Sequence, residues 1–399
     1  MNKNLTRLCN IASKDSRMII GLMSGTSLDG LDVALCCFTG SGQDTKIEIV
    51  QFDTVSYDSS FKEEIRSVFS KHTVNLEKLC LLNGWIAKEH AAMILQCLQK
   101  WKVSPDEIDL IASHGQTIYH APKLLHQQNK FGNATLQIGD GDQLAVSTGI
   151  ITISDFRQKH IAAGGEGAPL AVYGDYFIFS KKGEDRIMLN IGGIANFTYL
   201  PGDLDATTIF STDTGPGNTL MDAYCQQHFQ LAFDKNATIA SQGMVNEKLL
   251  HALLQHSFFK KGFPKTTGPE LFNLAYLESA ILKAGVPSIS PIDVMATLNR
   301  FSAITIVDSL QRSLNKNKTF TLYTSGGGMH NPLLMQHIQS LLPGYKFFTT
   351  DTLGINPDAK EALLFAILAN ECVAGEQTAI GNDTSDIPSV SMGKISFPW

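Results

Sequence analysis

A short stretch near the N-terminus carries residue types that bind phosphate. It lies between two apolar runs and combines two glycines, two hydroxyls and a carboxylate: Gly25, Thr26, Ser27, Leu28, Asp29 and Gly30. The glycine spacing matches a Walker loop, but Leu31 and Asp32 stand where that motif needs Lys and Ser or Thr. Successive backbone N–H groups bind anions without a lysine. We therefore expect a lysine-free phosphate turn in which Asp29 helps to hold Mg²⁺; alternatively, Asp29 only shapes the turn.

Three further glycine clusters follow β-rich runs. Each alone could be an ordinary turn, because glycine is the usual residue where φ is positive. Together they indicate hairpins that offer backbone N–H groups to a polyphosphate at strand ends, where ligands of α/β sheets bind. The clusters are Gly192–Asn196, Gly215–Asn218 and Gly326–Gly328, and they supply Gly192, Gly193, Gly326, Gly327 and Gly328 as candidates.

A carboxylate stands beside the second of these glycine clusters. In "STDTGPGN" we expect a strand to end before Asp213 and a glycine loop to follow. Asp213 is a candidate general base, and an N-cap or a Mg²⁺ ligand are the alternatives. The sequence leaves the choice open, because geometry decides a general base before residue type does.

Two other polar stretches could contact a substrate. In "SHGQT" we expect a strand over 110–113 that delivers His114 and Gln116 at its end, either as substrate contacts or as structural residues. In "SDFRQKHIAAGGEGAPLA", Arg157 is suited to bidentate recognition of a carboxylate. Its alternative is a surface ion pair with Asp155.

The apolar pattern predicts the elements that position these residues. Strands are expected over 18–23, 32–38 and 47–57, then a helix over 76–101 and a capping box that starts at Ser104. The pattern restarts near Arg186 with three strands, a helix over 291–314, a strand before the triple glycine, and a last helix with one apolar face: Ala362, Phe365, Ala366 and Ala369. A βββ meander followed by helices and further strands thus occurs twice.

Bulk properties exclude several classes of protein. A chain of 399 residues with 43% hydrophobic and 18% charged residues predicts two globular domains. A net charge of −6 disfavours nucleic acid or a membrane surface as partner, and no run is long enough for a membrane span. Seven cysteines without metal-ligand spacing indicate a reducing cytosol and no structural zinc. Residues 1–17 are expected to form a poorly ordered extension.

The ordered motifs resemble one family, the anhydro-N-acetylmuramic acid kinases. They are "GLMSGTSLDGLDVAL", "SHGQT", "LQIGDGDQLAVSTGI", "DFRQKHIAAGGEGAPL", "NIGGIANFT", "DTGPGN", "DVMATLNRFSA", "SGGGMHN" and "GINPDAKEALLFAIL". The resemblance implies an α/β fold of the actin-like (ribonuclease H-like) type, with duplicated βββαβα domains and a nucleotide cleft between them. We expect domain I over 18–152, rejoined by 385–399, and domain II over 153–384.

The resemblance also implies the chemistry. ATP and water would convert 1,6-anhydro-N-acetylmuramic acid into N-acetylmuramic acid 6-phosphate in peptidoglycan recycling, with Asp213 activating the water. Residues Gly25–Asp32 would bind ATP phosphates, with Mg²⁺, and Gly326–Gly328 would lie near the adenosine. The implied substrate contacts are His114, Gln116, Arg157, Asn196 and Glu361. A cytoplasmic homodimer is expected.

The chain departs from the family pattern at three positions. The pattern has Asp, Arg and Cys where this chain has His160, Pro269 and Ser325, so substrate preference is the property that these residues leave open. Two alternatives remain: a kinase of another amino sugar with the same fold, or a non-metabolic actin-like ATPase. We expect no chaperone-type peptide-binding domain.

Overall fold

The computed structural model describes residues 2–25, 28–168, 170–286, 288–315, 318–376, 380–381 and 388–399. Contacts divide the chain into two compact units. The first comprises 1–180, 206–208 and 355–399, and the second comprises 181–205 and 209–354. The borders of these units differ from the domain boundaries expected from the sequence, 152/153 and 384/385. Those domain boundaries stay a prediction. No helix in the described part of the chain has the length and apolar character of a membrane span.

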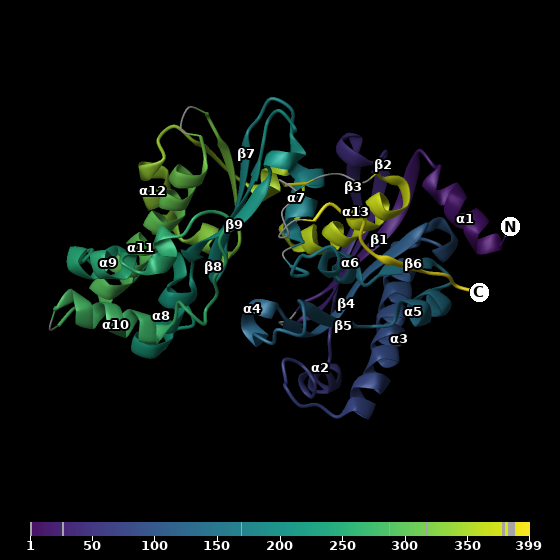
Figure 1. Ribbon diagram of the computed structural model, residues 1–399, viewed down its shortest axis with the longest axis horizontal. Coiled ribbons are helices and arrows are strands. Elements are labelled where there is room, and N and C mark those ends of the chain that lie inside the picture. The colour runs from purple at the N-terminus through teal and green to yellow at the C-terminus, as the bar shows by residue number, and fades with distance from the viewer. Residues whose placement is uncertain are drawn as a thin grey trace. The chain divides into compact units, whose positions relative to one another are not determined.

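The first unit is built on a seven-stranded sheet (Figure 1). An antiparallel meander of β1 (Ser16–Ser24), β2 (Gly30–Thr39) and β3 (Lys46–Ser56) matches the three predicted strands. Parallel strands β4 (Leu110–Ala121) and β6 (Ile151–Ser154) extend it beside β1, and β5 (Ala134–Ile138) pairs with β4. The last strand, β12 (Lys394–Ser396), returns to pair with β6.

Helices cover both faces of this sheet. Alternation along β1 sends Ile20 and Leu22 into a core shared with α3 (Leu76–Trp101), whose bounds are those predicted. Gly21 lies on the other face, where a Cβ would stand 2.0 Å from the carbonyl oxygen of Ala362 in α13 (Lys360–Ala374). Glycine therefore lets α13 approach the strand. The remaining helices of this unit are α2 (Ser59–Arg66), α4 (Lys123–His126), α5 (Gly141–Thr148), α6 (Phe156–Ala162) and α7 (Ala171–Phe179).

The N-terminal extension is ordered, so the expectation of a poorly ordered segment was wrong. Residues 3–12 form α1 (Lys3–Ala12), which Asn2 caps at its N-terminus. Ile11 is buried, and Arg7 donates to the carbonyl oxygen of Gly149 at 3.2 Å. Lys3 is exposed and Arg7 is half-buried, whereas Ile11 is buried, so α1 is an amphipathic helix with one side against the first unit.

The second unit has a five-stranded sheet. Its meander is β7 (Arg186–Ile191), β8 (Ile194–Leu200) and β9 (Phe210–Pro216), and parallel strands β10 (Thr321–Ser325) and β11 (Lys346–Thr349) follow β7. The helices are α8 (Thr219–Phe229), α9 (Glu247–Leu254), α10 (Leu274–Ala284), α11 (Pro291–Ser313) and α12 (Pro332–Leu341).

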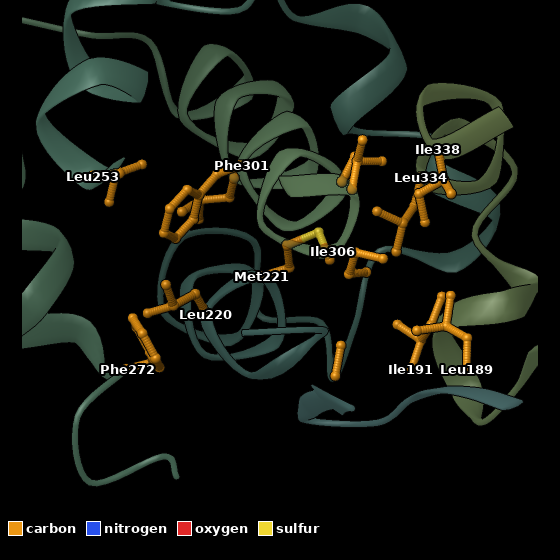
Figure 2. Packing of buried hydrophobic residues seen from close by; sticks show 14 of the residues in the cluster. Leu189, Ile191, Leu220, Met221, Leu253, Phe272, Phe301, Ile306, Leu334 and Ile338 are labelled. Atoms are coloured by element: carbon orange, nitrogen blue, oxygen red, sulfur yellow. The ribbon is translucent and has the colours of Figure 1, made fainter. Parts of the chain in front are cut away.

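Side chains from β7, α8, α11 and α12 meet in one apolar core (Figure 2). Ile191 at the end of β7 belongs to this core, as do Met221 of α8 and Ile306 of α11. The strand end that carries the Gly192 turn is therefore anchored by complete burial of Ile191.

The two sheets share one topology. In each, the third, second and first strands of the meander lie side by side, and two parallel strands follow the first: β3-β2-β1-β4-β6 and β9-β8-β7-β10-β11. The order of elements confirms the predicted duplicated α/β fold, which the sequence showed only as repeated patterning.

Candidate active site

Three glycine loops of the second unit meet around Ile191. The β7–β8 turn accepts hydrogen bonds from the loop after β9: Gly192 O from Asn218 N at 2.8 Å, and Gly193 O from Gly217 N at 2.8 Å. On the other side, a Cβ on Gly328 would stand 2.2 Å from the Ile191 side chain. These contacts bring together the loops that the sequence singled out separately.

Several of these glycines have room for a side chain. A Cβ on Gly192, Gly193 or Gly327 would meet no atom closer than 3.5 Å. A side chain would fit at these three positions without a clash, so the glycines leave room that a ligand can use.

The same edge of the sheet holds a helix N-terminus. Helix α8 begins at Thr219, and the side chain of Asn218 makes no capping hydrogen bond to it. The first N–H groups of an α-helix lack intrahelical partners and attract anions. Thr219 N already donates to Gly193 O at 3.1 Å, so the N–H groups of the next two residues of α8, together with the glycine loops, are those that could bind phosphate.

Asp213 lies within β9, and not after the strand as expected. The register pairs it with Asn196 of β8, and the strand runs on to Pro216, because pairing with β8 continues past a register shift to Ala195 and Ile194; Gly215 there has φ +143°, a conformation that favours glycine. Desolvation raises the pKa of Asp213 to about 6; the hydrogen bond from Thr267 N to Oδ2 opposes this, and Glu270 adds to it. A carboxylate with that pKa is ionised at neutral pH and can accept a proton.

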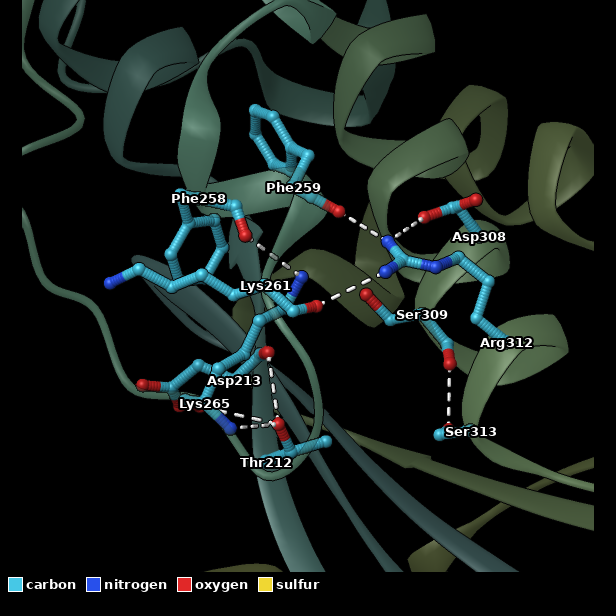
Figure 3. A network of polar contacts seen from close by, with 10 residues as sticks. All are labelled: Thr212, Asp213, Phe258, Phe259, Lys261, Lys265, Asp308, Ser309, Arg312 and Ser313. Carbon is cyan, nitrogen blue, oxygen red and sulfur yellow. Dashed lines mark hydrogen bonds and ion pairs between the residues drawn. The ribbon is translucent and has the colours of Figure 1, made fainter.

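Lys265 is a buried charged residue near Asp213 that the sequence did not predict. Its side chain is buried, with Nζ 4.4 Å from the ring centre of Phe258 (Figure 3), and desolvation lowers the pKa of the ammonium group to about 8. Its backbone contacts Thr212 and Asp213. No spacing rule connects Lys265 with a strand more than fifty residues earlier, so no signal in the sequence marked it.

In the first unit, the predicted phosphate turn joins β1 to β2. Thr26 and Ser27 lie outside the described residues. Leu28 and Leu31 are buried, so these residues could offer only backbone groups to a ligand. Asp29 is exposed, whereas Asp32 accepts a hydrogen bond from Thr54 Oγ1 at 2.6 Å.

A buried chain of side chains supports the start of this turn. Tyr57 lies 3.0 Å from His90 Nε2 and donates to Ser24 Oγ at 2.7 Å, and Ser24 donates to Gln116 Oε1 at 2.5 Å. Burial lowers the pKa of His90 to about 4, so the chain is neutral. The strand expected to end at Ser113 continues as β4 to Ala121, and Gln116 is fully buried inside it. Gly115 adopts φ +73° inside this strand, a conformation that glycine tolerates.

His114 and Arg157 contact each other. Arg157 Nε donates to His114 Nε2, and Nη1 donates to the carbonyl oxygen of Gly167 at 2.7 Å. Asp155 instead pairs with Lys394, so the alternative of an Asp155–Arg157 pair was wrong.

Glu361 lies in the first turn of α13 with its side chain open to solvent. Desolvation raises its pKa, Asp32 adds to this and Arg157 opposes it. Glu361, Asp32 and Arg157 therefore interact electrostatically within the first unit.

His160 holds the Gly164–Gly167 run, since its Nδ1 accepts a hydrogen bond from Gly167 N at 3.0 Å. Ser325 donates to Asn190 Oδ1 at 3.3 Å, and Pro269 is exposed. Among the described residues, no three His, Cys, Asp or Glu side chains gather as a metal site.

Comparison with known sequences settles the family. The sequence model described as "Anhydro-N-acetylmuramic acid kinase" matches residues 17–398. This chain belongs to that family. An anhydro-N-acetylmuramic acid kinase of Pseudoalteromonas atlantica is 58% identical over 100% of both chains, and one of Caldanaerobacter subterraneus subsp. tengcongensis is 40% identical over 98% of this chain and 100% of its own.

Solved structures outside the family show weaker similarity. The activator of the 2-hydroxyisocaproyl-CoA dehydratase from Clostridium difficile has a TM-score of 0.38 at 12% identity, covering 89% of this chain and 94% of its own. A hexokinase from Schistosoma mansoni has a TM-score of 0.35 at 12% identity, covering 90% and 86%. The fold of this anhydro-N-acetylmuramic acid kinase family member is shown by its sheet topology.

Proposed function

We propose that the protein is an ATP-dependent anhydro-N-acetylmuramic acid kinase of peptidoglycan recycling. Full-length membership of the family is the observation that carries this proposal. In the reaction, water adds to C1 of the anhydro sugar, the C1–O6 bond breaks, O6 takes the γ-phosphoryl group and ADP leaves. Asp213 accepts the proton of the attacking water, as its raised pKa and partial burial allow.

Backbone groups carry the phosphates in this proposal. Phosphoryl transfer makes little covalent demand on a protein, so positioning and charge neutralisation dominate. The turn at Gly25–Asp32, Gly192, Gly193 and the Gly326–Gly328 loop bind ATP. Arg157, Asn196 and Glu361 orient the sugar; the buried His114 acts through Arg157, and the buried Gln116 acts through Ser24.

Mg²⁺ fits the oxygen donors beside the first turn. Asp29 is exposed and Asp32 has one oxygen bonded to Thr54, a hard oxygen donor set that suits this ion. When bound with ATP, Mg²⁺ would supply charge neutralisation. We also infer a homodimer and a cytoplasmic location, where ATP is available; light scattering that gives a monomer mass at micromolar concentration would contradict the dimer.

A substrate panel tests the activity. ATP consumption should require the anhydro sugar, and related amino sugars without the bridge should not replace it. In isotope-labelled water, mass spectrometry of product quenched before ring exchange should place the label on C1. Label absent from C1 would favour a kinase that phosphorylates an open sugar directly, and ATP hydrolysis without sugar would favour a non-metabolic ATPase.

The Asp213→Asn variant tests the base. Removing a general base costs a factor on the order of 100 to 10,000 in rate, while ATP and sugar should still bind. Asp351→Asn, which changes an exposed carboxylate of the same unit, is the control. If added Mg²⁺ restores the Asp213→Asn rate, Asp213 is a metal ligand and not the base.

A further inference from the structure

The edge of the second sheet at Asp213 is covered by a segment distant in sequence. β9 is an edge strand, and its outer side contacts residues 265–267. Asp213 N donates to Lys265 O at 2.9 Å. The base is thus held between β8 on one side and this segment on the other.

The Thr212 hydroxyl fixes the segment in place (Figure 3). Its Oγ1 accepts a hydrogen bond from Lys265 N at 2.9 Å and lies 3.2 Å from Lys265 O. Thr212 is buried, so a valine there would leave the Lys265 N–H without its partner in a buried place.

The segment reaches the carboxylate itself. Thr267 N donates to Asp213 Oδ2 at 2.8 Å. One carboxylate oxygen is therefore engaged by the backbone, which leaves Oδ1 to accept a proton.

We propose that Thr212 and Thr267 are positioning residues for the general base: Thr212 anchors the 265–267 segment, and the Thr267 N–H holds Oδ2 so that Oδ1 is the basic oxygen. This inference rests on the proposed role of Asp213 as base. Thr212 and Thr267 act through Asp213 and form no bond to substrate.

The charges around Asp213 are compatible with this arrangement. Desolvation raises the pKa of Asp213, the Thr267 N–H lowers it, and Glu270 from the same loop raises it. The Lys265 ammonium group packs on Phe258 and donates to Phe258 O at 3.4 Å. Loss of the Thr267 hydrogen bond should therefore raise the Asp213 pKa further.

Carbon NMR of the full-length protein labelled at aspartate carboxyl groups gives a readout independent of activity. The Asp213 signal is assigned by its absence in Asp213→Asn. Thr212→Val should raise its titration midpoint by about half a pH unit or more, and the acid limb of kcat/KM should move with it. Thr212→Ser should restore the wild-type midpoint. Thr214→Val removes a buried hydroxyl of the same strand that bonds to Ala195 O, and it should leave the midpoint unchanged.

A wild-type measurement covers the case in which Thr212→Val does not fold. The amide proton shift of Thr267 should titrate with the same midpoint as the Asp213 carboxyl. An amide shift that is flat through that midpoint, or a Thr212→Val midpoint equal to wild type, would overturn the proposal. If the midpoints behave as expected but no sugar is phosphorylated, Thr212 and Thr267 still control the Asp213 carboxylate and the proposed function fails.

Discussion

Arg157 donates from Nε to Nε2 of His114 at 3.0 Å. A guanidinium group can only donate, so this nitrogen of His114 carries no proton and the ring is neutral. Burial lowers the His114 pKa to about 3, and the Arg157 charge lowers it as well. His114 therefore orients Arg157 at neutral pH as a neutral ring whose one proton lies on Nδ1.

This contact predicts the effect of Arg157→Lys. A lysine has no planar guanidinium group, so it cannot donate to His114 and to the Gly167 carbonyl oxygen at the same time. We expect the KM for the sugar to rise about tenfold or more while the KM for ATP changes less than about twofold. Steady-state kinetics with both substrates checks this, with Arg66→Lys on the exposed face of α2 as control. Equal increases in both KM values would mean that Arg157 supports the fold and does not bind the sugar.

The raised pKa of Asp213 predicts a stability that depends on pH. Below about pH 4 both folded and unfolded carboxyl groups are protonated, and the benefit of the raised folded pKa is lost as pH passes through about 6. Asp213→Asn should therefore become more stable than wild type as pH rises from 4 to 8, by about 1–3 kcal/mol. Urea unfolding at several pH values measures the difference. A gap that does not change with pH would mean that the carboxylate is not desolvated.

Asp29→Asn should weaken the use of Mg·ATP far more than sugar binding, because an exposed acid in the turn is available to the cation. Calorimetric titration with each ligand compares the two affinities. Glu48→Gln, an exposed carboxylate on β3, is the matched control. Equal losses for both ligands would leave Asp29 a structural turn residue.

Gly327→Ala tests whether this glycine is needed for nucleotide binding and not for stability. The added methyl would have its nearest atom, Asn218 Nδ2, at 3.7 Å, so the unfolding temperature should stay within a few degrees of wild type. Nucleotide affinity should nevertheless fall about tenfold, because the methyl occupies the open side of the loop. Gly344→Ala, with nothing within 4 Å of the new Cβ, should change neither. Unchanged ATP binding in Gly327→Ala would remove this loop from the nucleotide site.

Tyr57→Phe removes one hydroxyl from the chain that supports the phosphate turn. The ring should keep its stacking on Phe61, but Ser24 and His90 lose their shared partner, which costs about 1–3 kcal/mol of stability. We also expect the KM for ATP to be higher in Tyr57→Phe than in the wild-type protein. Tyr173→Phe loses a buried hydroxyl bonded to Pro388 O, and its KM for ATP should not rise. Thermal unfolding and kinetics together distinguish the two effects.

Local patterns predicted the parts of this fold that local interactions decide. Asn75 caps α3, and the apolar spacing fixed its length, so the predicted bounds were confirmed. The capping box at Ser104 was confirmed for the same reason. Two strand ends were predicted too early, because a glycine followed each of them. Gly115 and Gly215 lie inside strands, since pairing with β5 and β8 continues past them.

Long-range contacts escaped prediction. The bond from Thr267 to Asp213 joins residues more than fifty positions apart, and no periodicity encodes it. The contact between His114 and Arg157 depends in the same way on β4 and α6 packing together. Sequence reasoning named His114, Arg157 and Asp213 by type, but only tertiary structure supplies their partners.

The first unit contains residues from both ends of the chain. Its sheet is extended by β12, α13 packs against β1, and Asn4 donates to the carbonyl oxygen of Trp399 at 2.8 Å. During synthesis, a ribosome delivers the whole second unit before it delivers α13 and β12. Newly made β1 therefore has one apolar face uncovered until α13 emerges, which makes the nascent first unit prone to aggregation during that interval.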